Sequence, residues 1–125
     1  MSNPTAGGAR ILLAEDDNDM RRFLVKALQA AGYVVASFDN GLSAYNRLRE
    51  EPFELLLTDI VMPGGMNGHE LARVALLRRP ELKTLLTTGF SEVTNGNGAS
   101  GARHILCKPY RKDELLRCVR EALDA

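Results

Sequence analysis

Short apolar runs alternate with amphipathic segments along most of this 125-residue chain. Five runs have the length and apolar character of strands buried on both faces, at residues 10–14, 33–38, 55–58, 83–87 and 104–107. After four of these runs, apolar residues recur at helical spacing, as at Phe23, Ala27 and Leu28. Such strand–helix units predict a doubly wound α/β domain, in which helices cover both faces of a five-stranded parallel sheet.

Composition argues against a general nucleic-acid binder, a membrane protein and a disulfide-linked secreted protein. Lys plus Arg and Asp plus Glu both number 16, so no net charge draws the chain to nucleic acid or to an anionic membrane. No apolar run approaches the roughly 20 residues that span a bilayer, and residues 1–8 lack the apolar stretch of a signal peptide. Cys107 and Cys118 argue against a disulfide framework and are interpreted as small buried side chains. We expect a cytoplasmic protein with a flexible tail at residues 1–9 and one domain at residues 10–123.

The chemistry is expected where the strands end, because ligands of doubly wound sheets bind outside the carboxyl ends of the strands. Carboxylate, hydroxyl and ammonium groups follow four of the predicted strands, at Glu15, Asp16, Asp17, Asp59, Thr87, Thr88 and Lys108. Clustered carboxylates repel each other unless a cation neutralises them, and Mg²⁺ takes carboxylate oxygens while keeping waters that a phosphate oxygen can replace. The pattern therefore favours phosphoryl transfer onto an aspartate, assisted by Mg²⁺.

Each of these positions also has a purely structural interpretation. The acidic residues 15–17 could cap a helix, Thr87 and Thr88 could be ordinary strand formers, and Lys108 with Pro109 could form a turn. Asp59 is the hardest to explain in this way, because burying a carboxylate at the end of an apolar strand is costly without a partner.

Four motifs in this order resemble the receiver domains of two-component response regulators, which have a flavodoxin-like fold. They are residues 11–17, residues 57–63, Thr88-Gly89 and Lys108-Pro109. The resemblance covers residues 10–123. It implies that Asp59 is the phosphoacceptor and that Mg²⁺ is held by Asp16 directly, by Glu15 through water, by Asp59 and by the backbone carbonyl of Val61.

The resemblance also assigns roles to the remaining groups. Lys108 matches the lysine that pairs with the acceptor and then with the phosphoryl group, and Thr88 matches the hydroxyl that moves to bond a phosphoryl oxygen. Asp17 is interpreted as the residue that starts a helix. The implied donor is the phosphohistidine of a histidine kinase or phosphotransfer protein, and residues 20–23 match the docking region for that donor. The domain would catalyse only its own phosphorylation and dephosphorylation.

The sequence departs from the family pattern in three places. Ile105 stands where the family has a rotating aromatic side chain, so output is expected to use another group, such as Tyr110 or Phe90. Residues 91–101 stand in the place of the fourth helix but are rich in Asn and Gly and have no apolar stripe, so a short, frayed or absent helix is expected. The loop at residues 63–68 is one residue longer than usual.

The two halves of the chain resemble different members of the family. Residues 10–63 resemble CpdR-like single-domain regulators, which implies an output partner of the AAA+ protease class. Residues 62–123 are similar to the receivers of hybrid histidine kinases, so a domain of such a kinase is one alternative. A second alternative is a constitutive binding module that takes no phosphate. A third, an aspartyl phosphatase, is disfavoured because such enzymes usually have an acid where this chain has Val61.

Overall fold

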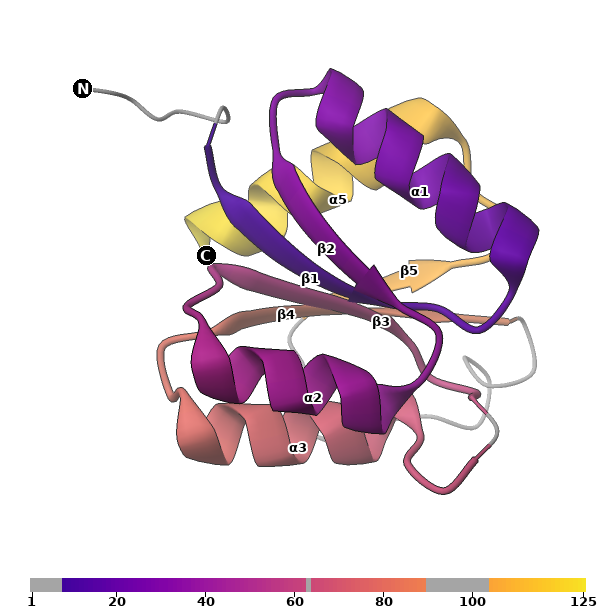
Figure 1. Cartoon of the computed structure of the whole chain (residues 1–125). Coiled ribbons are helices and arrows are strands. Elements are labelled where there is room, and N and C mark those ends of the chain that lie inside the picture. The colour runs from indigo at the N-terminus through magenta and orange to yellow at the C-terminus, as the bar shows by residue number, and fades with distance from the viewer. Residues whose placement is uncertain (1–7, 63, 90–103) are drawn as a thin grey trace.

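Five parallel strands form one sheet in the computed structural model, which describes residues 8–62, 64–89 and 104–125 (Figure 1). The strands are β1 (Arg10–Ala14), β2 (Val34–Phe38), β3 (Leu55–Asp59), β4 (Lys83–Thr88) and β5 (His104–Cys107). Their order across the sheet is β2-β1-β3-β4-β5, so β2 and β5 are the edges. All five predicted strands are present, with ends that differ from the predictions by one residue at most.

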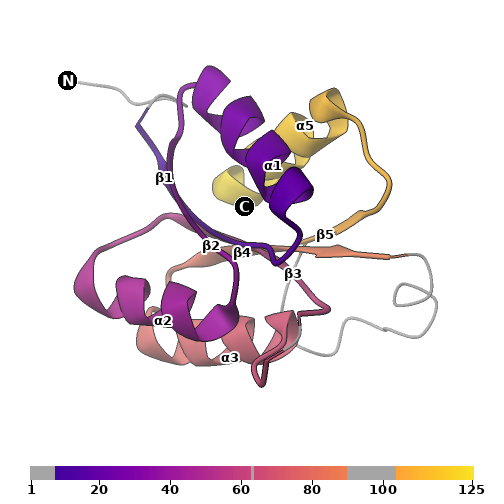
Figure 2. The ribbon, with the colours of Figure 1, turned by 45° about the vertical axis from the view of Figure 1, so that its right-hand side comes forward.

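Helices cover both faces of the sheet, as the alternation of strands and helices predicts (Figure 2). They are α1 (Asn18–Ala30), α2 (Gly41–Glu50), α3 (Gly68–Arg78) and α5 (Lys112–Asp124). In Figure 2, α1 and α5 lie on one side of the sheet, the α1/α5 face, and α2 and α3 lie on the other, the α2/α3 face. The doubly wound α/β fold is therefore confirmed. The segment 91–101, for which we expect at most a short helix, lies outside the described residues.

The sheet separates two apolar cores. Leu57 of β3 packs with buried residues of α1 and α5, whereas its neighbour Leu56 packs with buried residues of α2 and α3. Successive strand residues point to opposite faces, so a sheet covered on both sides must be apolar at consecutive positions. This explains why the strands appear in the sequence as unbroken apolar runs and not as alternating ones.

Capping side chains fix where α1 and α3 begin after the loops that follow β1 and β3. Asp17 caps α1 by accepting a hydrogen bond from the Met20 N–H at 2.9 Å. Asn67 and Glu70 form a reciprocal capping box at the start of α3.

Among the described residues, no helix combines the length and the apolar character needed to cross a membrane.

The interpretation of Cys107 as a buried side chain is wrong. Its side chain is exposed, because β5 is an edge strand and Cys107 points away from the α1/α5 face that buries its neighbour Leu106. Cys118, on α5, is partly buried.

Candidate functional site

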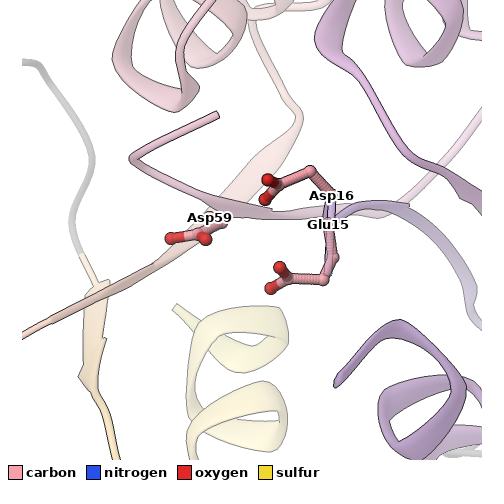
Figure 3. Close-up of side chains that lie close together, drawn as sticks. All are labelled: Glu15, Asp16 and Asp59. Carbon is pink, nitrogen blue, oxygen red and sulfur yellow. The ribbon is translucent and has the colours of Figure 1, made fainter. Parts of the chain in front are cut away.

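Three carboxylates meet at the carboxyl edge of the sheet (Figure 3). Glu15 and Asp16 follow β1 directly, and Asp59 is the last residue of β3, the strand beside β1. One oxygen from each of the three side chains lies within 4.8 Å of the others. Glu15 and Asp59 are buried, with 1% and 7% of their surfaces exposed, and Asp16 is more accessible. The structure thus brings together the acidic residues predicted from the strand ends.

Lys108 supplies the positive charge of the cluster from the far edge of the sheet. Its Nζ donates a hydrogen bond to Asp59 Oδ2 at 3.0 Å and lies 3.7 Å from Glu15 Oε1. The Lys108 N–H donates to the carbonyl of Thr88 at 2.8 Å, which ties the end of β5 to the end of β4. Lys108 precedes a cis peptide bond to Pro109.

Burial and charge shift the pKa values of this cluster in opposite senses. Burial raises the pKa of Glu15 to about 6, and the nearby charge of Asp59 acts in the same direction, against the Asp17 N–H that donates to the carboxylate at 3.0 Å. For Lys108, burial lowers the pKa, but the hydrogen bond to Asp59 and the charge of Glu15 outweigh it and the net shift is upward. The ammonium is therefore firmly protonated, while Glu15 ionises around its raised pKa of about 6.

An open depression joins these groups at the surface. Its lining comes from four strand ends: Glu15, Asp16, Asp17, Asp59, Val61, Gly89 and Lys108. Val61, predicted to offer a backbone carbonyl to the metal, is on this lining.

The donor set fits a magnesium ion. Three carboxylates converge, and Glu15 Oε1 is buried with no hydrogen-bond partner among the described residues. A hard cation that takes oxygen ligands would satisfy that oxygen and offset the repulsion between the acids. Asp16, Asp59, Glu15 and the Val61 carbonyl are the groups that would hold it.

The Thr88 side chain lies at the edge of the site and, among the described residues, makes no hydrogen bond to the carboxylates or to the Lys108 ammonium. Its side chain is buried at the end of β4, and its hydroxyl donates to the carbonyl of Gly89 at 3.3 Å. Asp17 caps α1, as the sequence indicates, and its N–H holds Glu15 in place. Both residues therefore serve the site through neighbouring groups in this state.

Two further residues belong to the surroundings of the site. The strand-end pattern includes Thr87 but assigns it no role, and Tyr110 is expected only as a possible output group. Tyr110 is half-buried and donates a hydrogen bond to Met20 Sδ at 3.4 Å. Burial raises its pKa, with smaller contributions from the charges of Glu15 and Asp59, so the phenol stays protonated. Thr87, the register partner of Asp59, is buried and its hydroxyl has no hydrogen-bond partner among the described residues. Alternation along β4 puts Thr87 on the face of Leu85, but only the register of the sheet shows that it lies beside Asp59.

Of the two groups expected to act in output in place of an aromatic at position 105, the structure describes only Tyr110. Ile105 itself is 43% exposed on β5. Tyr110 packs against the core of the α1/α5 face. Phe90 lies outside the described residues.

Comparison with known proteins agrees with this geometry. A family model described as the response regulator receiver domain matches residues 11–120. The response regulator receiver protein CpdR of Brucella abortus (strain 2308) is 56% identical over 118 residues, which cover 93% of this chain and 98% of that protein.

Solved structures show the same fold. A CheY-like receiver domain protein from Methanospirillum hungatei is 30% identical with a TM-score of 0.85, over 93% of this chain and 94% of that one. TrrA from Thermotoga maritima, solved in complex with Mg²⁺-BeF, is 28% identical with a TM-score of 0.82, over 91% of this chain and 98% of that one. With four strand-end motifs assembled into one acidic site, this chain belongs to the response regulator receiver domain family of two-component systems.

Proposed function

We propose that this receiver domain accepts a phosphoryl group from a phosphohistidine onto Asp59 and thereby switches its binding to a partner protein. The observation that carries the proposal is the setting of Asp59. Its carboxylate is buried at a strand end, accepts a hydrogen bond from Lys108 at 3.0 Å and shares a cluster with two other acids. A buried carboxylate with this much charge around it is arranged for reaction more than for stability.

The transfer is a displacement at phosphorus. A carboxylate oxygen of Asp59 forms a P–O bond as the P–N bond to the donor imidazole breaks, and the imidazole leaves with the electron pair of that bond and takes a proton. Bound Mg²⁺ would neutralise charge on the phosphoryl oxygens. The Lys108 ammonium, already 3.0 Å from Asp59 Oδ2, stabilises the negative charge that the phosphoryl oxygens bring beside the acceptor. The Thr88 hydroxyl would turn from the Gly89 carbonyl to a phosphoryl oxygen.

The donor is a histidine kinase or a phosphotransfer protein, and the product state binds an output protein. Residues 20–23 at the start of α1, with Phe23 37% exposed, form the docking surface for the donor beside the site. We infer, from the sequence resemblance to CpdR-like regulators, a cytoplasmic regulator whose output partner is a AAA+ protease; the 56% identity to CpdR of Brucella abortus agrees with that resemblance. Hydrolysis of the aspartyl phosphate by water returns the domain to its starting state.

Intact-protein mass spectrometry tests the proposal. Incubation with acetyl phosphate and Mg²⁺ should add one phosphoryl group to the native protein and none to Asp59→Ala. Asp39→Asn is a matched control, because Asp39 follows β2 at the same edge but lies outside the acidic cluster; it should be labelled like the native protein. If a phosphohistidine donor protein also fails to label folded native protein, the chain is a constitutive binding module and the proposal is wrong.

A pull-down separates the CpdR-like output from the alternative of a hybrid-kinase receiver. A CpdR-like regulator should bind its AAA+ protease in one phosphorylation state only, so native protein and Asp59→Ala should differ after treatment with the donor. Equal binding by both proteins in both conditions would contradict this output.

A further inference from the structure

Thr87 presents a buried hydroxyl that nothing in the proposed reaction uses. The residue is 1% exposed, and its Oγ1 has no hydrogen-bond partner among the residues that the structure describes. A hydroxyl taken out of water without a partner costs free energy, and a valine of the same shape would avoid that cost. We therefore expect the hydroxyl to find a hydrogen-bond partner in another state of the site.

The register of the sheet places this hydroxyl on the reactive face. Leu85, two residues before Thr87, packs into the core of the α1/α5 face, so Thr87 points to that face as well. Its register partner on β3 is Asp59, which shares the face of Leu57. Its partner on β5 is Leu106, which also packs into that core.

Lys108 has to pass over this part of β4 to reach Asp59. β4 lies between β5, which Lys108 follows, and β3, which ends at Asp59. Neighbouring strands are about 4.8 Å apart, so the two backbones are separated by roughly 10 Å, and the lysine side chain spans most of that gap. Its Nζ nevertheless lies 3.0 Å from Asp59 Oδ2, so its stem crosses the end of β4 on the α1/α5 face. Thr87 is the last β4 residue on that face.

We propose that Thr87 is a positioning residue for Lys108: its hydroxyl accepts a hydrogen bond from the Lys108 ammonium when that ammonium leaves the Asp59 carboxylate. The ammonium has three N–H donors and no acceptor. It bonds Asp59 Oδ2 in this state, and the proposed reaction moves it from the carboxylate toward the incoming phosphoryl group. Thr87 offers the ammonium a neutral acceptor on its path, which keeps the lysine beside the reacting group.

Thr87 and Thr88 thereby have separate roles. Consecutive strand residues point to opposite faces, so the Thr88 hydroxyl, which bonds the Gly89 carbonyl, lies away from the Lys108 stem. The step at which Lys108 turns to Thr87 rests on the proposed function of Asp59. The hydrogen bond between the Lys108 ammonium and the Thr87 hydroxyl can be measured without phosphate or metal.

A double-mutant cycle in chelator tests that contact. In the native background, Thr87→Val should raise the midpoint of thermal unfolding by about 3–5 °C, because an unpaired hydroxyl is replaced by a methyl group. In Asp59→Ala, the ammonium loses its bond to Asp59 but keeps Glu15 Oε1 at 3.7 Å, and a further N–H turns to Thr87. Thr87→Val should then lower the midpoint by about the same amount. Adding Lys108→Met to the Asp59→Ala background should restore the rise. A shift of the same sign and size in all three backgrounds would overturn the proposal.

Reaction rates test the role. Thr87→Val should slow labelling by acetyl phosphate and Mg²⁺ by about tenfold, and Thr87→Ser, which keeps the hydroxyl, should stay within about twofold of the native rate. Thr84→Val is the matched control, since Thr84 is a buried threonine of the same strand but faces the opposite way from Leu85; it should leave the rate unchanged. Thr87→Ala repeats the test if the valine variant folds poorly.

The two proposals fail in different ways. If Thr87→Val and Thr87→Ala are labelled at the native rate, the positioning role is wrong while phosphorylation of Asp59 stands. If the native protein takes no phosphoryl group, the proposed function is wrong, and the unfolding cycle still decides whether Lys108 moves to Thr87.

Discussion

At the scale of single residues, three consecutive acids have three different surroundings. Glu15 is buried on the α1/α5 face, Asp16 lines the open depression, and Asp17 turns to cap α1. The strand ends and the helix begins within these residues, so each carboxylate leaves the backbone in a different direction. Adjacent and chemically similar residues are therefore expected to respond differently to substitution and to pH.

Glu15 should make the metal-free protein less stable as the pH rises from about 4.5 to about 6. Its pKa is raised to about 6 in the folded state, mainly by burial, so the folded protein binds more protons than the unfolded chain within that window. Its contribution to the free energy of unfolding is therefore greatest below the window and is lost above it, by about 1 kcal/mol after allowance for screening. Urea unfolding across this range, in chelator, measures the slope. Glu15→Gln should remove this component; a slope unchanged in the variant would contradict the assignment.

Asp17→Ala and Asp16→Ala should separate capping from metal binding. Loss of the hydrogen bond from Asp17 to the Met20 N–H should lower the free energy of unfolding by about 1 kcal/mol, with or without Mg²⁺. Asp16→Ala removes one charge from a repelling cluster, so it should not destabilise the metal-free protein, but it should abolish stabilisation by Mg²⁺. Thermal unfolding of both variants with and without Mg²⁺ measures this. Equal losses in the two variants would mean that neither role is specific.

At the scale of elements, the site depends on how closely the loop after β3 returns to the sheet. The Gly68 N–H donates to the carbonyl of Ile60 at 2.8 Å, where α3 begins against the end of β3. A Cβ at position 68 would lie 2.2 Å from the Asp59 carbonyl oxygen and 2.7 Å from Ile60 Cα. Only glycine permits this approach, so the start of α3 and the backbone of the acceptor are fixed together.

Gly68→Ala should therefore damage both stability and reaction. The new methyl group meets backbone and not a flexible side chain, so relief requires the loop to move; we expect a loss of about 2–3 kcal/mol in the free energy of unfolding and slower labelling of Asp59. Gly41→Ala is the control, because its new Cβ would come no closer than 3.2 Å to any atom. The atoms at that distance are two in the flexible Met66 side chain and the Met66 carbonyl oxygen. Urea unfolding and labelling rates measure both effects. Native-like labelling in Gly68→Ala would show that the acceptor tolerates a displaced loop.

At the scale of the whole molecule, most of the fold could be predicted from the sequence because the strands are buried on both faces. Residues such as Leu55, Leu56 and Leu57 are apolar in sequence whichever way they point, so the strands were found without knowledge of the sheet order. The strand ends then located Glu15, Asp16, Asp59 and Lys108 together. The roles of the individual residues came from the family resemblance, because strand-end position alone leaves capping and turn formation open.

The features that the sequence missed depend on side-chain direction and on edges. The sequence predicts that Cys107 is buried, but it is exposed on an edge strand, and edge position follows from the strand order. The strand-end pattern groups Thr87 with Thr88, but the two side chains point to opposite faces, and only the register between β3 and β4 sets Thr87 beside Asp59. Strand order and register are properties of the whole sheet, and the local sequence pattern gives neither of them.

Metal binding and folding should be linked in this domain, because the acids repel one another in the folded protein and are far apart in the unfolded chain. Mg²⁺ that binds only the folded state should raise the free energy of unfolding by about 2.7 kcal/mol at 100 times its dissociation constant. Thermal unfolding over a Mg²⁺ titration measures this, with NaCl at matched ionic strength to separate screening. Asp39→Asn should keep the effect, and Asp59→Ala should weaken it. An equal rise with NaCl would mean that the cluster is only screened; a rise specific to Mg²⁺ would mean that closing the sheet edge creates the metal site.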